Sequence, residues 1–281
     1  MRLWIIGKRG LLSQAFQRKC QEKGIDYLAT SRKEVDLQDV KSVKAQFETL
    51  MFTHIINCSG YTAVDRAEEE SEAAHALNGE AVELLARLAK QHGKKMIHFS
   101  TDYVFDGKAE EYPEGAETAP LSVYGKSKER GEKKLFEQYP EACLVRTSWL
   151  FGRDGRDFVK KMVEMMQSQE DIRVVSDQKG RPTYADDLAE AVLSILDQSG
   201  IFHFANSGPV SWHEWALAIR EKLRAKNVPL RCQKIHAVST EAHGARAPRP
   251  KSSVLATEKF DTPHWEAGLE EVLSSVISSL K

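Results

Sequence analysis

Short apolar runs alternate with segments of helical periodicity over the first half of the chain. The apolar runs cover residues 2–6, 25–30, 54–58, 95–99 and 142–146. Runs of this length, bounded by turn residues, are typical of buried strands. Helical patterns lie between them, after Gly10, over 45–51, over 78–91 and after Ser122. This alternation predicts an α/β fold with a doubly wound, Rossmann-type parallel sheet.

The pattern changes from about residue 147. Helices are expected over 158–167, 184–196, 212–225 and 264–280, with short strands at 172–175 and 200–204. Ser211 and Glu214 form a capping-box pattern, and the nearby Trp212 and Trp215 are interpreted as core residues. We therefore predict a Rossmann domain over residues 1–146. Most of residues 147–281 should form a smaller α/β substrate lobe, with some segments returning to the first domain.

Composition narrows the class of protein. The 281 residues are 41% hydrophobic and 29% charged, with a net charge of −1, so nothing suggests binding to nucleic acid or to an anionic membrane. No apolar run reaches the roughly 18 residues of a membrane span, and the first run is too short for a signal peptide. The four cysteines are far apart, which predicts free thiols and a cytoplasmic location. No His or Cys spacing predicts a metal site.

A glycine-containing turn follows the first predicted strand. Gly7 and Gly10 stand between that strand and a helix, which is the context in which a glycine motif indicates dinucleotide binding. Gly7 would permit the tight turn, and Gly10 would let backbone N–H groups approach a pyrophosphate at the helix N-terminus. Ser13 occupies the position of the usual third glycine, which weakens the motif. Glycine turns also follow strands in proteins without such ligands.

Two further segments suggest how a dinucleotide would be held. Arg32 follows the second strand, where a basic residue accepts a 2′-phosphate and an acidic residue holds a ribose hydroxyl. Arg32 therefore favours NADPH, with NADH as the alternative donor; the competing interpretation is a solvated surface cation. Cys58, Ser59 and Gly60 follow the third strand. We call them the small-residue wall, because small side chains let a cofactor pass close to the backbone.

Hydroxyl groups at the end of the fourth strand, together with a later Tyr and Lys, indicate the chemistry. Ser100 and Thr101 end an apolar run, and Tyr124 precedes Lys128 by four positions. In a helix, Tyr124 and Lys128 would share one face, and the ammonium would lower the pKa of the phenol. Tyr124 is then a candidate general acid or base, with Ser100 or Thr101 bonding the same substrate oxygen. Proton delivery to a carbonyl oxygen requires a hydride donor.

Motifs along the whole chain resemble those of a known family. They occupy residues 7–10, 61–65, 100–105, 123–128, 146–149, 180–183 and 247–250. On these motifs the chain resembles the extended short-chain dehydrogenase/reductases, and within them the dTDP-4-dehydrorhamnose reductases. Tyr-x-x-x-Lys alone is a weak signal, but its combination with the other motifs is specific.

The resemblance implies NADPH-dependent reduction of the C4 keto group of dTDP-4-dehydro-6-deoxy-L-mannose, which gives dTDP-L-rhamnose. It implies that Tyr124 donates a proton to the C4 oxygen and that Lys128 holds the nicotinamide ribose. Thr101 would hydrogen-bond the reacting oxygen, Asp102 the sugar, and Trp149 would pack on the substrate. The residues implied to contact the cofactor, besides Tyr124 and Lys128, are Gly7, Gly10, Leu11, Leu12, Arg32, Asp36, Leu37, Cys58, Ser59 and Gly60.

Departures from the family pattern leave some questions open. Some members bind Mg²⁺ at a dimer interface through a Glu shortly after the glycine loop; Gln14 and Ala15 here argue against that metal and leave a homodimer open.

Arg249, between two prolines, either bridges the lobes or reaches a nucleotide phosphate.

Two other functions compete with the implied one. One is a reductase or epimerase of another nucleotide 4-keto sugar. The other is a non-catalytic regulatory subunit resembling the β subunit of methionine adenosyltransferase. Trp149 argues for an enzyme, because a bare regulatory scaffold does not need a sugar-stacking aromatic residue at that position.

Overall fold

Six parallel strands form the central sheet of the computed structural model, which describes residues 1–279. They are β1 (Arg2–Ile6), β2 (Asp26–Thr30), β3 (His54–Asn57), β4 (Lys95–Thr101), β5 (Cys143–Thr147) and β10 (Gly200–Phe204). Their order is β10-β5-β4-β3-β1-β2, and every neighbouring pair is parallel. The predicted α/β fold with a doubly wound sheet is confirmed.

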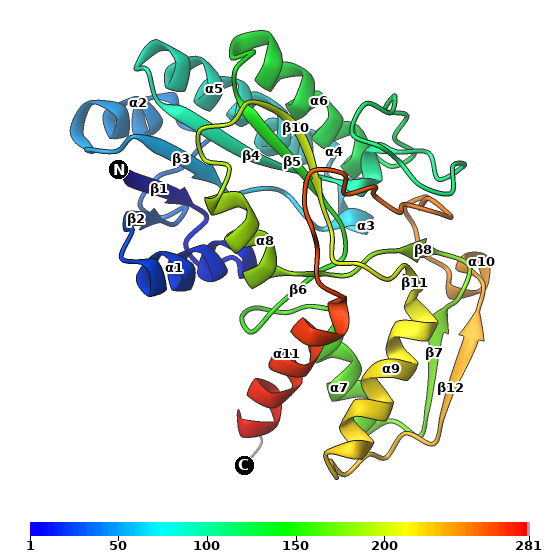
Figure 1. Cartoon of the computed structure of the whole chain (residues 1–281). Coiled ribbons are helices and arrows are strands. Elements are labelled where there is room, and N and C mark those ends of the chain that lie inside the picture. The colour runs from blue at the N-terminus through cyan, green and yellow to red at the C-terminus, as the bar shows by residue number, and fades with distance from the viewer. Residues whose placement is uncertain (280–281) are drawn as a thin grey trace.

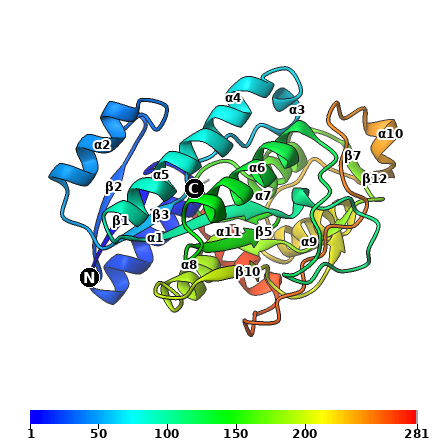
Figure 2. The ribbon, with the colours of Figure 1, turned by 90° about the horizontal axis from the view of Figure 1, so that it is seen from above.

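Helices cover both faces of this sheet (Figures 1 and 2). One face packs against α2 (Val40–Thr49), α5 (Ala81–Gln91) and α6 (Val123–Gln138), and the other against α1 (Leu11–Lys23) and α8 (Ala185–Leu193). Alternation along β1 explains the two cores: Trp4 and Ile6 enter the first, and Leu3 and Ile5 enter the second. A strand buried on both faces must be apolar throughout, as β1 is.

A third core lies in the part of the molecule below the sheet in Figure 1. It contains residues of α7 (Phe158–Ser168), β7 (Asp171–Val175), α9 (Trp212–Ala225), β12 (Lys234–Val238) and α11 (Trp265–Ser279). The predicted last helix extended to Leu280, which lies outside the described residues. None of the helices within residues 1–279 is long and apolar enough to cross a membrane.

Short elements connect these two parts of the molecule. Two-residue strands pair β6 (Leu150–Phe151) with β9 (Thr183–Tyr184), and β8 (Lys179–Gly180) with β11 (Val210–Ser211). Single-turn segments are α3 (Val64–Ala67), α4 (Ser71–His75), η2 (Asp102–Val104) and α10 (Thr240–His243). Two elements from the second half of the chain belong to the first sheet: β10 pairs with β5, and α8 packs on α1.

The predicted start of α2 was five residues too late. The helix begins at Val40, because the side chain of Asp39 caps it by accepting a hydrogen bond from the Lys41 N–H at 2.9 Å. Such a cap replaces one hydrogen-bond partner missing in the first turn.

A π-helical turn, η1 (Ala76–Glu80), connects α4 to α5. The sequence pattern predicted a helix over residues 78–91 without this irregularity. The turn brings the backbone of Asn78 against α6: a Cβ on Gly131 would lie 2.1 Å from the Asn78 carbonyl oxygen. Glycine at 131 therefore allows the two helical segments to touch backbone to backbone.

The Gly131→Ala substitution should destabilise the protein by roughly 1–3 kcal/mol, because the added methyl group forces α6 away from η1. Gly115→Ala is the matched control, since a Cβ there meets nothing within 4 Å. Thermal unfolding followed by circular dichroism measures both variants. A Gly131→Ala midpoint equal to that of the control would show that the contact is not required.

Candidate active site

Strand order reverses between β1 and β3, and ligands of doubly wound sheets bind at the carboxyl ends of the strands beside such a reversal. Gly7 ends β1 there, with φ of 98°, a conformation that favours glycine. A Cβ on Gly7 would lie 3.3 Å from the Cys58 carbonyl carbon and from the Ser59 nitrogen. The glycine turn and the small-residue wall therefore lie side by side.

The N-terminus of α1 opens beside this wall. Gly10 is its N-cap in an extended conformation, and no side chain of residues 1–279 caps the helix. The N–H groups of the first turn are thus without a side-chain acceptor, and the helix dipole favours an anion there. Leu11 packs beside Gly152, and Ser13 is fully buried, which explains why a small residue is needed. This arrangement fits a pyrophosphate.

The other residues predicted to line the cofactor differ in their exposure. Arg32 is exposed, and its Nε lies 3.5 Å from a carboxylate oxygen of Asp36. Its Nη2 donates to the Gln38 amide oxygen at 3.3 Å. Leu12 and Leu37 are buried in the cores on opposite faces of the sheet. The glycine turn, the start of α1 and the small-residue wall are together called the cradle.

The start of α6 determines where Tyr124 lies. Ser122 caps the helix by accepting a hydrogen bond from the Gly125 N–H at 3.1 Å. Gly125 packs against η2, where a Cβ would lie 2.3 Å from the Tyr103 carbonyl oxygen. This close contact brings Tyr124 to the end of β4, where its side chain lies near that of Thr101.

Burial raises the pKa of Tyr124 to about 12; the nearby Thr101 hydroxyl lowers it, and the charge of Asp102 raises it further. The sequence-based prediction that Lys128 lowers this pKa is therefore wrong for the protein alone. Surroundings of low polarity disfavour the phenolate more than nearby groups stabilise it. The phenol is protonated at neutral pH, as a proton donor must be.

Lys128 lies one turn further along α6, against the small-residue wall. Its Nζ donates to the Phe99 carbonyl oxygen at 2.6 Å and lies 3.5 Å from Nε2 of His98. A Cβ on Gly60 would lie 3.9 Å from this Nζ. Burial lowers the pKa of Lys128 to about 8, opposed by the charge of Glu132. The ammonium group thus reaches the surface where a cofactor would pass.

Asn78, which the sequence pattern does not single out, links the wall to the helix. Its Oδ1 accepts from the Tyr61 N–H at 2.8 Å, and its Nδ2 donates to the Ser127 hydroxyl at 2.9 Å. Ser127 in turn donates to the Tyr124 carbonyl oxygen at 2.7 Å. A polar residue at the buried start of an apolar helical stripe is the signal that could have identified Asn78.

The structure distinguishes Thr101 from Ser100. The Thr101 hydroxyl lies near Tyr124, whereas the buried Ser100 hydroxyl has no hydrogen-bond partner within the described residues. Asp102 is 2% exposed and accepts a hydrogen bond from Thr101 at 3.0 Å. Tyr124, Thr101 and Asp102 thus form one cluster. Within residues 1–279, no group of three or more His, Cys, Asp or Glu side chains is arranged to hold a metal ion.

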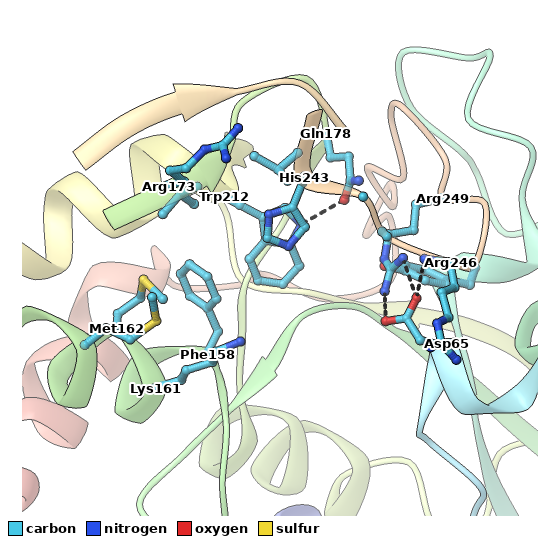
Figure 3. A pocket seen from close by; sticks show the side chains of 16 residues that line it. Asp65, Phe158, Lys161, Met162, Arg173, Gln178, Trp212, His243, Arg246 and Arg249 are labelled. Atoms are coloured by element: carbon cyan, nitrogen blue, oxygen red, sulfur yellow. Dashed lines mark hydrogen bonds and ion pairs between the residues drawn. The ribbon is translucent and has the colours of Figure 1, made fainter. Parts of the chain in front are cut away.

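A cavity of about 530 Å³ borders this cluster through Tyr103. The rings of Tyr103 and Tyr124 meet edge to face at 5.8 Å. Figure 3 shows aromatic and apolar side chains on one side of the cavity and an ion pair on the other. The apolar and aromatic lining residues include Phe158, Met162, Met165 and Trp212, and the cationic ones are Lys161, Arg173, Arg246 and Arg249.

Trp149 lies behind this lining. Its backbone has φ of 45°, which is rare for a residue with a large side chain. Its ring stacks on Trp212 with a centroid separation of 3.5 Å. Trp212 is half-buried, packs against the third core and also lines the cavity, which its interpretation as a core residue did not include. Trp215, in contrast, is fully buried as predicted.

Arg249 forms the ion pair in Figure 3 with Asp65 of α3. Its Nη2 lies 2.7 Å from the Asp65 carboxylate, which also accepts from the backbone N–H groups of Arg246 and Ala247. The Arg249 hydrogen bond is the largest influence that lowers the pKa of Asp65 to about 2. Arg249 therefore bridges the two parts of the molecule and lines the cavity as well.

Known proteins match the chain over nearly its full length. The family described as "RmlD substrate binding domain" matches residues 1–278. The chain is 34% identical to spore coat polysaccharide biosynthesis protein SpsK of Bacillus subtilis, covering 96% of this chain and 95% of that protein. It is 33% identical to dTDP-4-dehydrorhamnose reductase of Salmonella typhimurium, covering 99% of each.

Solved structures are similar as well. The dTDP-4-dehydrorhamnose reductase of Bacillus anthracis, determined in complex with NADP, superposes with a TM-score of 0.91 at 34% identity. The match covers 97% of this chain and 98% of that one.

Proposed function

The chain belongs to the RmlD substrate binding domain family, and from this we propose that it reduces the C4 keto group of dTDP-4-dehydro-6-deoxy-L-mannose to give dTDP-L-rhamnose, using NADPH. The observation that carries the proposal is the position of Tyr124 near Thr101 at the end of β4, with Lys128 one turn further against the small-residue wall. Relatives named dTDP-4-dehydrorhamnose reductase match the chain almost end to end. The four free cysteines suit a reducing cytoplasm, where we place the reaction.

The cradle described above suits a dinucleotide. Gly7, Gly10 and the uncapped start of α1 would hold the pyrophosphate, and the small-residue wall would let the cofactor pass. Arg32 would accept a 2′-phosphate, so NADPH is the expected donor, with NADH as the alternative. Lys128 would hold the nicotinamide ribose. When bound, the reduced nicotinamide supplies the hydride that the keto carbon accepts.

The protein's own contribution is the proton. Tyr124 is protonated because burial raises its pKa to about 12, and it donates that proton to the C4 oxygen. Thr101 hydrogen-bonds the same oxygen and keeps it close to Tyr124. Lys128, one turn further along α6, brings its ammonium group to the small-residue wall, where it would meet the cofactor.

The cavity suits the nucleotide part of the substrate. Lys161, Arg173 and Arg249 line it, and such cations bind a diphosphate through charge-assisted hydrogen bonds. Trp212 offers a face on which a base can stack. Trp149 would hold the stacked ring of Trp212 in place beside the substrate, and Asp102 would hydrogen-bond a sugar hydroxyl.

The direct test uses purified protein with NADPH and dTDP-4-dehydrorhamnose. We expect nicotinamide absorbance to fall, with no loss when either reactant is omitted. Turnover of another dTDP-4-keto sugar alone would move the substrate assignment to the competing reductase. No oxidation of NADPH with any such sugar would refute an enzymatic function and favour a regulatory subunit.

The Tyr124→Phe substitution should lower kcat by roughly 100-fold or more, because it removes the proton donor. NADPH affinity, measured by fluorescence titration, should stay close to wild type. Tyr139→Phe is the matched control, since it removes the same hydroxyl just beyond the other end of α6. Wild-type turnover in Tyr124→Phe would mean that another group supplies the proton.

The Arg32→Ala substitution should reduce the preference for NADPH over NADH about 10-fold or more, because a charged hydrogen bond to phosphate is lost. The ratio of kcat/KM for the two cofactors measures this preference. Lys33→Ala, which removes the adjacent cation, should leave the ratio unchanged. If both variants keep the wild-type ratio, Arg32 is merely a surface residue.

A further inference from the structure

The loop that follows β2 lies against the glycine turn. The N–H group of Lys8 donates to the Thr30 carbonyl oxygen at 3.0 Å, which ties the end of β2 to that turn. Residues 31–34 come next and form a tight turn, in which the Glu34 N–H donates to the Ser31 carbonyl oxygen at 2.9 Å. In doubly wound folds, residues at this position determine whether a ribose 2′-hydroxyl or a 2′-phosphate is accepted. NADH and NADPH would therefore be distinguished at this loop.

The carboxylate of Glu34 occupies an anion-binding site on this loop. Its Oε2 accepts two hydrogen bonds from Ser31, one from the backbone N–H at 2.8 Å and one from the hydroxyl at 2.7 Å. Its Oε1 lies 3.5 Å from Nζ of Lys8, which belongs to the glycine turn. Backbone N–H groups, hydroxyls and ammonium groups are also the donors that proteins use to bind phosphate. The protein's own carboxylate thus holds the partners that a 2′-phosphate needs.

These contacts differ from those of an ordinary capping box. In a capping box the Ser hydroxyl accepts a hydrogen bond from the N–H three residues on, and the Glu side chain returns to the Ser N–H. Here the Ser31 hydroxyl donates to the carboxylate instead, and the next helix of the described chain, α2, begins only at Val40. The contact with Lys8 joins segments 26 residues apart. Capping of a helix therefore does not account for this arrangement.

Arg32 and Glu34 carry opposite charges on the same loop. The Arg32 side chain is 78% exposed and is directed to Asp36 and Gln38, and the Glu34 side chain is 48% exposed. Exposed charge pairs contribute little to stability, so both side chains can rearrange at low cost when a cofactor binds. A carboxylate at this position accepts a hydrogen bond from a 2′-hydroxyl, but it repels a 2′-phosphate and occupies the donors that the phosphate needs.

We propose that Glu34 lowers the preference for NADPH by competing with its 2′-phosphate for Ser31 and Lys8. This inference rests on the proposed function, which takes a reduced nicotinamide cofactor as the hydride donor. With NADH, the carboxylate would stay on Ser31 and accept a hydrogen bond from the ribose hydroxyl. With NADPH it would have to leave, and Arg32 would offset the cost of its departure. Arg32 thus favours NADPH and Glu34 favours NADH, so the protein accepts both cofactors.

Nucleotide fragments test this competition without sugar or nicotinamide. The fragment 2′,5′-ADP carries the 2′-phosphate, and 5′-AMP is the same molecule without it. In Glu34→Gln the competing charge is absent and the amide can donate a hydrogen bond to phosphate, so affinity for 2′,5′-ADP should rise about 10-fold. Affinity for 5′-AMP should stay close to wild type. Isothermal titration calorimetry measures both affinities.

Two further variants serve as controls. Glu48→Gln removes the same charge from an exposed position in the last turn of α2 and should change neither affinity. Glu34→Asp keeps a negative charge at the position, so it should raise the affinity for 2′,5′-ADP less than Glu34→Gln does. An equal rise in Glu34→Asp would show that charge is not the cause and would overturn the proposal. An unchanged or lower affinity for 2′,5′-ADP in Glu34→Gln would overturn it as well.

An equal change in the affinities for 2′,5′-ADP and 5′-AMP would also contradict the proposal, because it would mean that Glu34 only shapes the turn. Turnover gives a second readout. The ratio of kcat/KM for NADPH to that for NADH should rise about 10-fold in Glu34→Gln. The change should lie mainly in KM, because the interaction affects cofactor binding and not the reacting atoms. A ratio equal to that of wild type would refute the competition.

The two measurements distinguish this inference from the function on which it rests. If Glu34→Gln binds 2′,5′-ADP no better while wild type reduces the sugar with NADPH, the competition is wrong and the function stands. If Glu34→Gln binds 2′,5′-ADP more tightly but wild type oxidises no NADPH with any keto sugar, the competition stands and the function fails.

Discussion

The contact of α6 with its neighbours is the constraint on which the site depends. The helix touches η1 and η2 backbone to backbone, because Gly131 and Gly125 have no side chains to hold it away. Ser122 fixes the residue at which the helix begins. These contacts bring Tyr124 to the end of β4, and Lys128, one turn further, to the small-residue wall. Proton donor and cofactor cradle are therefore aligned by the same helix.

Burial at this edge of the sheet determines the charges of the reacting groups. It raises the pKa values of Tyr124 and Asp102 and lowers that of Lys128. All three shifts have one cause, the cost of placing a charge where water is largely excluded. Tyr124 thus keeps its proton at neutral pH, which is the state that a proton donor to a carbonyl group requires. On the cavity side, where charge is balanced by pairing, Asp65 stays ionised opposite Arg249.

The periodicity of apolar and polar residues, together with the turn residues, was enough to predict the alternating strands and helices, the glycine turn and the helix that carries Tyr124 and Lys128. The features it did not reveal depend on contacts between distant segments. Trp212 could not be distinguished from Trp215 by helical position, because the cavity forms only when other segments fold against α9. The π turn at Asn78 reflects its fit to α6. The direction of the Tyr124 pKa shift depended on burial, which spacing to Lys128 does not report.

The central claim is that this site delivers hydride and proton to C4 of a dTDP-linked keto sugar. The most direct measurement uses NADPH deuterated at the transferring position of its nicotinamide, with dTDP-4-dehydrorhamnose in ordinary water. NMR spectroscopy of the product should identify dTDP-L-rhamnose with deuterium bonded to C4 and ordinary hydrogen on its oxygen. A product without deuterium at C4, or a reduced sugar other than dTDP-L-rhamnose, would contradict this account.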